Sequence, residues 1–252
     1  VATLFASIYT DPQTHMAIIL GTGFNSSFVC DCKAIRKWSG PLPESGKMLI
    51  NTEWGDFDRS LTVLPVTKYD RLVDEKTTTK GIQRFEKMIS GMYLGEIVRL
   101  ILVDLISNAG LFDGKYRDKL SVPFTFDTAY MSRIERDHSA DLRDVSSLLS
   151  DLLKIHKSTV KDRQVLKRIC ELVGVRSSRL CAAGIAAILN LTNRLKGGVI
   201  AIDGSLFEHY PHFSNRIIDT LLELIGISAD HILLKQVKDH SGKGAALAAL
   251  MT

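Results

Sequence analysis

At the start of the chain, the spacing of apolar positions predicts one helix followed by a short hairpin. Apolar residues recur at helical spacing over residues 1–9, and Asp11-Pro12 ends this helix because proline lacks the amide hydrogen that a helix interior needs. A second apolar run, Ala17–Leu20, stops at Gly21-Thr22-Gly23 and resumes as an alternation of apolar and polar residues through Val29. This pattern predicts two strands joined by a tight corner that contains glycine.

After the hairpin, the pattern predicts a loop, a third strand and a long apolar helix. Residues 38–46 are rich in Pro, Gly and Ser and are typical of a surface loop, and residues 47–51 predict a short apolar strand. Residues 56–80 have few periodic apolar positions, so we expect a long polar connection there. A helix begins near Gly81, and over residues 97–105 it is apolar almost all round, as in helices that are buried in a core.

Further along the chain, the pattern predicts more helices and then two strand–turn–helix units. Residues 127–153 are typical of two amphipathic helices, and residues 161–193 predict a helix that breaks at Gly174 and resumes at Ser177. The first of the two units has its strand at residues 199–202, and the second has its strand at residues 232–237.

The turns of these two units are candidate ligand positions. Asp203-Gly204-Ser205 opens a helix after the first strand, and Ser241-Gly242-Lys243-Gly244 precedes the helix Ala245–Met251 after the second. A helix N-terminus presents unpaired N–H groups, and ligands of open α/β sheets bind outside the carboxyl ends of the strands. The second turn is not a P-loop, because the upstream glycine and the following Ser or Thr of that motif are missing.

Composition narrows the class of protein without fixing it. The chain has 252 residues, of which 45% are hydrophobic and 24% charged, and its net charge of +4 is spread among acidic residues, which does not favour nucleic-acid binding. No apolar run approaches the ~18 residues that span a bilayer. Four cysteines without a second Cys or His pair nearby predict reduced thiols in a cytoplasmic protein, with neither a disulfide framework nor a zinc site.

The hairpin corner is the first candidate for binding chemistry. Backbone N–H groups and the Thr22 hydroxyl can converge there on a phosphate oxygen, and Asn25 is placed to direct its amide at a small polar ligand. The alternative is that the two glycines serve only the geometry of the turn.

Two carboxylates and a glycine are further candidates. Glu53 directly follows an apolar strand and precedes Trp54-Gly55, which suits either a ligand contact or a turn acid that pairs with a basic neighbour. Glu86 lies near the N-terminal end of its helix, where the helix dipole favours an anion. Gly91 and Gly95 stand in the interior of the same helix, and their cost in helix propensity predicts a kink or a close backbone approach.

Five ordered motifs give the sequence a specific resemblance. They are Leu-Gly-Thr-Gly-Phe-Asn (20–25), Ile-Asn-Thr-Glu-Trp-Gly (50–55), Phe-Glu-Lys-Met-Ile-Ser-Gly-Met-Tyr-Leu-Gly-Glu (85–96), Asp-Gly-Ser-Leu (203–206) and Ser-Gly-Lys-Gly-Ala-Ala (241–246). In this order the chain resembles the carboxyl-terminal part of a eukaryotic hexokinase or glucokinase over essentially its whole length. The resemblance implies an α/β fold, namely the larger RNase H-like lobe of the actin/hexokinase/Hsp70 nucleotide-binding fold, with a mixed sheet flanked by helices. It also implies that residues 1–252 are one domain, truncated at its N-terminus.

The resemblance assigns roles to particular residues. Asn25, Glu53 and Glu86 would bind the sugar hydroxyls. The positions implied for ATP are Thr22, Gly91, Met92, Val175, Arg176, Ser177, Ser178, Arg179, Ser241, Gly242, Lys243, Gly244 and Ala245. The family's catalytic aspartate would precede Val1, as would the small domain and the aspartate that partners Mg²⁺, so no catalytic residue and no metal ligand is assigned within the chain.

Some of these positions also have ordinary structural explanations. Lys243 stands at one helix start, and Arg176 and Arg179 stand three residues apart at another. For all three, the alternatives are contact with a phosphate and exposure to solvent. His209 and His212 have no carboxylate or Cys at ligand spacing and are expected on the surface or in packing. The sequence also departs from the family's Asp-Gly-Ser-Gly at 239–242, where the bulky His240 replaces a glycine and is expected to shift the loop of the adenosine contacts.

The function that the resemblance implies is transfer of the ATP γ-phosphate, with Mg²⁺, to the 6-hydroxyl of a hexose such as glucose, the first step of glycolysis. The parent protein would be active, and the chain without its upstream base would be inactive. The alternative is a non-catalytic hexokinase-like sugar sensor or interaction module, which would keep the sugar contacts. A filament protein with an actin-like fold would not need Glu53 and Glu86 together.

Overall fold

The computed structural model describes residues 1–251, which form two compact units. The first, here called the sheet unit, contains Val1–Trp54, Arg179–Glu208 and the residues from Ser214 onward. The second, here called the helical unit, contains Gly55–Ser178 and His209–Phe213. The prediction of a single domain over residues 1–252 is not tested by this division and stays a prediction.

The sheet unit is built on five strands in the order β3-β2-β1-β4-β5. These strands are β1 (Thr14–Leu20), β2 (Phe24–Asp31), β3 (Lys47–Asn51), β4 (Gly198–Asp203) and β5 (Ile232–Gln236). The first three pair in antiparallel fashion, whereas β4 and β5 run parallel to β1. The predicted hairpin, third strand and two later strands are all confirmed.

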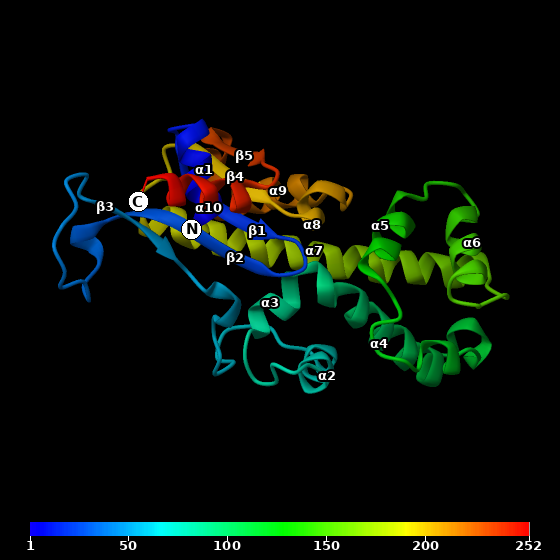
Figure 1. The fold of residues 1–252 in the computed structure, drawn as a ribbon. Helices are drawn as coiled ribbons and strands as arrows, with labels where there is room; N and C mark the ends of the chain where they lie inside the picture. The colour runs from blue at the N-terminus through cyan, green and yellow to red at the C-terminus, as the bar shows by residue number, and fades with distance from the viewer. Residues whose placement is uncertain (252) are drawn as a thin grey trace. The chain divides into compact units, whose positions relative to one another are not determined.

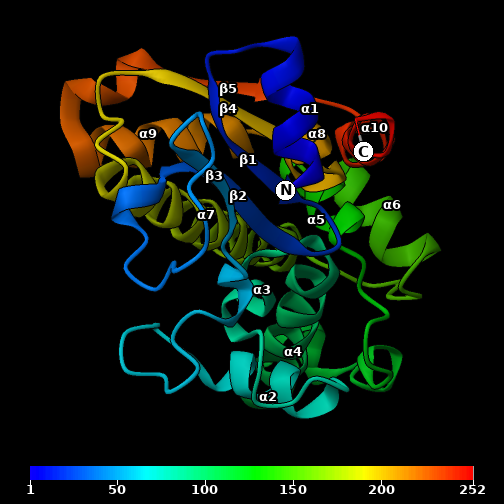
Figure 2. The same ribbon diagram turned by 60° about the vertical axis from the view of Figure 1, so that its left-hand side comes forward.

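Helices α1 (Ala2–Thr10) and α10 (His240–Leu250) lie side by side, as Figures 1 and 2 show, and α1 packs against strands β1 and β4. Leu4 of α1 packs with Ala17 of β1, Ala201 of β4 and Val237 in the core. The contact between the two helices is close, because a Cβ added to Gly244 would lie 1.9 Å from the backbone oxygen of Ala2. The helices α8 (Ser205–His209) and α9 (Phe213–Ile225) follow β4 along the chain.

The helical unit contains a series of helices around the buried α4. They are α2 (Lys68–Lys76), α3 (Arg84–Ile89), α4 (Gly91–Ala109), α5 (Thr128–Arg136), α6 (Arg143–Asp151) and the first part of α7 (Val160–Leu191). The predicted burial of the apolar helix is confirmed for α4, where even Glu96 and Arg99 are buried as an ion pair at 2.5 Å. The two amphipathic helices predicted within 127–153 are confirmed as α5 and α6.

Three predictions of local structure are wrong. The polar connection predicted over 56–80 contains α2, which begins with a capping box between Thr67 and Asp70 that the apolar pattern did not reveal. The helix α7 does not break at Gly174 but runs on from Val160 to Leu191, since one glycine costs only about 1 kcal/mol of helix propensity. The helix predicted to begin at Ala245 begins at His240, so the residues 241–244 form the first turn of α10 and not a separate turn before it.

The expected irregularity near Gly91 is confirmed. Ser90 has extended φ and ψ angles of −74° and 150°, so that α3 ends there and α4 begins at Gly91. The expected close approach is also confirmed for Gly95, because a Cβ at this position would lie 2.1 Å from the backbone oxygen of Phe126. Both features belong to the helical unit.

By length and composition alone, α7 passes the test for a membrane span, contrary to the expectation from the apolar runs. Of its most apolar window, 56% is buried inside the protein. Core helices pass the same test, so this helix is weak support for a span.

Candidate functional site

The hairpin corner and the turn after β4 meet at one edge of the sheet. The corner closes with a hydrogen bond from Gly21 N to Gly23 O at 3.1 Å. Gly204 has a φ of +139°, and a Cβ there would lie 2.3 Å from Leu20 O, so only glycine allows this approach. The Thr22 side chain at the corner is exposed, as binding to an external group requires.

An amide–carboxylate cluster lies next to this corner, and strand register explains its assembly. Pairing of β2 with β3 places Ser27 opposite Asn51, and Thr52 N donates to Ser26 O at 3.0 Å. The chain beyond β3 therefore runs alongside Asn25. Asn25 Nδ2 donates to Glu53 Oε1 at 2.8 Å, so the structure brings together two of the three side chains that were predicted to bind sugar.

The backbone and the aromatic neighbours hold Glu53 in an unusual conformation. Glu53 has a φ of +46°, a left-handed conformation that is uncommon for residues other than glycine and often marks a functional position. The next residue, Trp54, stacks on Phe24 with ring centroids 4.6 Å apart and also packs against Gly184. These contacts fix the turn that carries the carboxylate.

Glu86, the third predicted sugar ligand, lies in the first turn of α3 in the helical unit. Burial, followed by the charge of Glu86, raises the pKa of the Tyr93 phenol. Glu86 belongs to the helical unit, whereas the cluster around Glu53 belongs to the sheet unit.

Helix α3 is anchored by a buried charge network centred on Asp74 of α2. Asp74 accepts hydrogen bonds from Lys87 Nζ at 2.8 Å, Arg84 Nε at 3.1 Å and Gly81 N at 3.1 Å. Lys87 Nζ also donates to Thr79 O at 2.6 Å and Ile82 O at 3.0 Å. Burial tends to raise the pKa of Asp74, but the hydrogen bonds outweigh it, and the pKa lies below the usual aspartate value.

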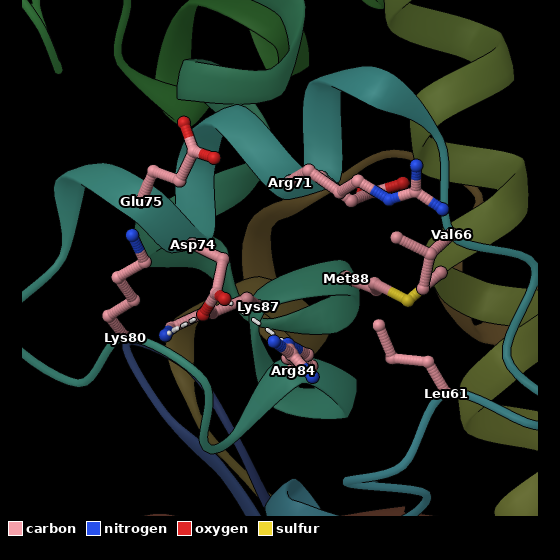
Figure 3. A pocket seen from close by; sticks show the side chains of 10 residues that line it. Leu61, Val66, Arg71, Asp74, Glu75, Lys80, Arg84, Lys87 and Met88 are labelled. Carbon is pink, nitrogen blue, oxygen red and sulfur yellow. Dashed lines mark hydrogen bonds and ion pairs between the residues drawn. The ribbon is translucent and has the colours of Figure 1, made fainter.

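A small cavity of about 200 Å³ lies beside this network. Figure 3 shows its apolar side, formed by Leu61, Val66 and Met88, and its charged side around Asp74. The remaining lining side chains are also charged: Asp70, Arg71, Glu75, Lys80, Arg84 and Lys87. The volume is below the roughly 300 Å³ at which typical small-molecule pockets begin.

Hydroxyl groups hold the backbone at the start of α4, where Gly91 and Met92 are predicted to contact ATP. Ser177 Oγ donates to Ile89 O at 2.8 Å, and Thr128 Oγ1 donates to Gly91 O at 2.6 Å. Ser177 and Ser178 are completely buried, whereas Met92 is 52% exposed. Of these side chains, Met92 is thus the one that reaches solvent.

The two predicted arginines lie inside α7 and are both paired with carboxylates. Arg176 makes two hydrogen bonds of 2.8 Å to Asp70 in the helical unit. Arg179 makes bonds of 2.9 and 2.6 Å to Glu223 in the sheet unit. The expectation that they begin a helix is wrong, because α7 is continuous through Val175–Arg179.

The start of α10 accommodates the histidine that departs from the family motif. His240 Nδ1 lies 2.9 Å from Ser7 Oγ of α1, and His240 N donates to Asp203 Oδ2 at 3.2 Å. Burial and then the charge of Lys243 lower the pKa of His240, which favours the neutral ring. Ser241, Gly242, Lys243 and Ala245 are exposed at this helix start.

Neither the cysteines nor the acidic residues of the described chain assemble a metal centre. All four cysteines are free, and no group of three His, Cys, Asp or Glu side chains within residues 1–251 has the geometry to hold an ion. Burial raises the pKa of the Cys170 and Cys181 thiols, so neither is poised to react.

Comparison with known proteins defines the family. Residues 15–251 match the family model described as Hexokinase. The chain is 45% identical over 257 residues to Hexokinase-1 of Spinacia oleracea and 43% identical over 257 residues to Hexokinase-2 of Solanum tuberosum. Both alignments cover 99% of this chain and 51% of the relative. This chain belongs to the hexokinase family.

Solved structures agree with this assignment. A hexokinase from Schistosoma mansoni complexed with glucose is 32% identical and superposes with a TM-score of 0.89, covering 100% of this chain and 56% of that one. A second hexokinase crystal structure gives a TM-score of 0.83 at 31% identity, covering 99% and 53%. The predicted α/β fold class is thus confirmed. The chain spans about half the length of the curated relatives it matches.

Sequence reasoning missed one member of the cluster. Asn51 donates to Glu53 Oε1 at 2.5 Å and accepts a hydrogen bond from Asn25 Nδ2 at 3.1 Å. The signal lay in the motif Ile-Asn-Thr-Glu-Trp-Gly, in which Asn51 and Glu53 are two residues apart. A strand would place them on the same side, but only the pairing of β2 with β3 brings Asn25 to both.

Proposed function

We propose that this chain forms the sugar-binding and part of the nucleotide-binding portion of an ATP-dependent hexokinase that phosphorylates glucose at its 6-hydroxyl. The observation that carries the proposal is the cluster of Asn25, Asn51 and Glu53 beside an exposed Thr22, in a chain of the hexokinase family. The solved Schistosoma mansoni relative is described as complexed with glucose, and that likeness supports a hexose as the ligand.

The chemistry of the cluster suits a polyol. A carboxylate accepts hydrogen bonds and an amide both donates and accepts, so together they match hydroxyl groups held in fixed directions. Among the described residues, none donates a hydrogen bond to Glu53 Oε2, which leaves this oxygen for a ligand. A sugar lacking the matching hydroxyl would leave polar groups of the site unpaired, which is the basis of discrimination between sugars.

The donor set also fits ATP at the same edge of the sheet. The exposed Thr22 hydroxyl and the exposed first turn of α10 at Ser241–Lys243 offer hydroxyl and N–H donors, which suit phosphate oxygens. Bound ATP with Mg²⁺ would supply the phosphoryl group. The proton acceptor for the sugar hydroxyl is proposed to be the aspartate that the family places before Val1.

A coupled ATP-to-ADP assay with glucose tests the proposal. It is run on this chain and on a version extended upstream through the expected aspartate. If the extended version is active and this chain is not, the result supports a hexose kinase whose base precedes Val1. Activity in this chain alone contradicts that assignment of the base. Glucose binding by calorimetry without turnover in either version supports the alternative, a sugar sensor.

A substitution at the carboxylate adds a sharper test. We expect Glu53→Gln to weaken glucose binding by about ten- to a hundred-fold, because hydrogen bonds to a charged group contribute about 1.5–3 kcal/mol. The matched control is Glu44→Gln in the exposed loop before β3, which removes the same charge away from the cluster. Calorimetric titration with glucose is the measurement, and equal affinities in the two variants would contradict the role of Glu53.

A further inference from the structure

The cluster contains a side chain that links both predicted sugar ligands of the sheet unit. Asn51 Nδ2 donates to Glu53 Oε1 at 2.5 Å, and Asn51 Oδ1 accepts from Asn25 Nδ2 at 3.1 Å. Asn25 Nδ2 reaches the same Glu53 oxygen at 2.8 Å, so the three side chains close a ring of hydrogen bonds. We propose that Asn51 is a positioning residue that sets the directions of the Asn25 amide and the Glu53 carboxylate toward a polyhydroxylated ligand. This inference rests on the proposed function.

The orientation of Asn25 follows from its other partners. Its Oδ1 accepts from Ser26 N at 2.8 Å and from Thr52 Oγ1 at 3.2 Å. The backbone N–H is only a donor, so it must face the amide oxygen, and the NH₂ group must face Asn51 and Glu53. The amide of Asn25 thus has one orientation in this ring.

The orientation of Asn51 follows in turn. It faces an NH₂ group on Asn25 and a carboxylate oxygen on Glu53, so it must offer an acceptor to the first and a donor to the second. An aspartate at this position would keep the acceptor and lose the donor. An alanine would lose both, and the exposed Glu53 side chain would regain the rotamers that the ring restricts.

The ring leaves Glu53 with a defined free oxygen. Two amides converge on Oε1, so Oε2 points away from them, and the φ of +46° fixes the backbone from which the carboxylate projects. Removing one of the two amides lets the carboxylate rotate about its terminal torsion, which is broad in the absence of partners. Asn51 therefore acts on the ligand through Glu53 and Asn25.

The test is the pH dependence of glucose binding in an Asn51→Asp variant of the full chain. The new carboxyl would face Glu53 at hydrogen-bonding distance, and two carboxylates sharing a site raise the pKa of one of them. The Val1 ammonium also interacts with the charge of Glu53, and it is present in wild type and variant alike. At low pH the shared proton replaces the lost N–H donor. At higher pH the two charges repel and turn Glu53 away. We expect affinity about ten-fold or more below wild type at pH 8, with the gap narrowing toward pH 5.

The chain offers a matched control. Asn108 Nδ2 donates to Asp104 Oδ1 at 2.8 Å, so Asn108→Asp places a carboxyl against a carboxylate in the same way but away from the cluster. This variant should bind glucose like wild type at every pH. A purely structural role for Asn51 predicts instead that Asn51→Asp changes stability and leaves the pH dependence of affinity as in wild type.

A second readout does not need the sugar. The side-chain NH₂ signals of Asn25 in ¹⁵N NMR spectra should titrate in Asn51→Asp and not in Asn108→Asp. Titration of these signals together with loss of affinity supports the inference. If wild type binds glucose and Asn51→Asp binds equally well from pH 5 to 8, the positioning role is wrong while the proposed function stands. If neither this chain nor the version extended upstream binds glucose, both are wrong.

Discussion

Single side chains in this protein are held by several buried partners at once. Lys87 is the strongest case, because its side chain is 3% exposed and its Nζ contacts Asp74, Thr79 O and Ile82 O. Its neighbour along the chain is Glu86, so the same buried ammonium that closes the network also fixes the helical turn that carries a predicted sugar ligand.

Removing this ammonium should therefore be costly. We expect Lys87→Met to lower the free energy of unfolding by about 3–5 kcal/mol, because Asp74 is left buried without its main partner. The measurement is urea unfolding followed by circular dichroism. The matched control is Arg59→Met, which removes a cation that is 63% exposed and pairs with Asp56, and which should cost only about 0–1 kcal/mol. Equal losses in the two variants would contradict the importance of burial.

Sequence reasoning selected two side chains that the structure brings together. Asn25 was selected because it lies just past the hairpin corner and Glu53 because it follows an apolar strand, and a hydrogen bond of 2.8 Å joins them. Asn51 was not selected, because its role depends on the distance between two chain segments rather than on its own neighbours. Arg176 and Arg179 were predicted at a helix start, but continuous helix surrounds them.

At the scale of elements, the contact between α1 and α10 depends on one glycine. Gly244 lies against the backbone of Ala2, which cannot move aside as a side chain can. We expect Gly244→Ala to destabilise the protein by about 1–3 kcal/mol through overpacking, despite the better helix propensity of alanine. The lowered melting temperature would be measured by circular dichroism.

A second glycine in the same helix provides the comparison. A Cβ at Gly242 would meet only the flexible Asp239 carboxylate, at 2.8 Å. Gly242→Ala should therefore be neutral or should stabilise by up to about 1 kcal/mol. Stabilisation by both substitutions would show that α1 and α10 are less tightly packed than the structure indicates.

Element boundaries were predicted well for strands and less well for helices. The central strands β1 and β4 are buried along most of their length and show in the sequence as short apolar runs, and each of the predicted strands is found. Helix α2 buries only Asp70, Val73 and Asp74, so its apolar signal is weak and its capping box is the main local mark. Helix α7 continues through Gly174 because tertiary packing outweighs a small loss of propensity.

At the scale of the whole molecule, several carboxylates with lowered pKa values make the folded state less stable in acid. Hydrogen bonds from Lys68, Tyr69 and Asn108 lower the pKa of Asp104 to about 2, and backbone and side-chain donors hold the pKa of Asp58 well below its usual value. Asp74 also has a lowered pKa. Because these folded pKa values lie below those of the unfolded chain, the unfolded state binds more protons in acid.

We therefore expect stability to fall as the pH drops below about 4, through the lowered folded pKa values. An earlier, smaller decline should begin near pH 6.5, where unfolded histidines gain a proton that the folded chain resists at His15 and His240, mainly because of burial. Urea unfolding from pH 8 to pH 3 measures both. A free energy of unfolding that stays constant or increases as the pH falls from 8 to 3 would contradict the lowered pKa values.

The sequence by itself determined the family, the order of strands along the chain and the residue types that suit a polyol and a phosphate group. These features depend on local sequence patterns, namely apolar periodicity and short motifs such as Leu-Gly-Thr-Gly-Phe-Asn and Ile-Asn-Thr-Glu-Trp-Gly. Tertiary structure alone decided that Asn51 closes a ring with Asn25 and Glu53, that Lys87 is buried, and that His240 pairs with Ser7. Each of these contacts joins residues through strand pairing or helix packing, and the free energy of such contacts depends on distances that no local pattern encodes.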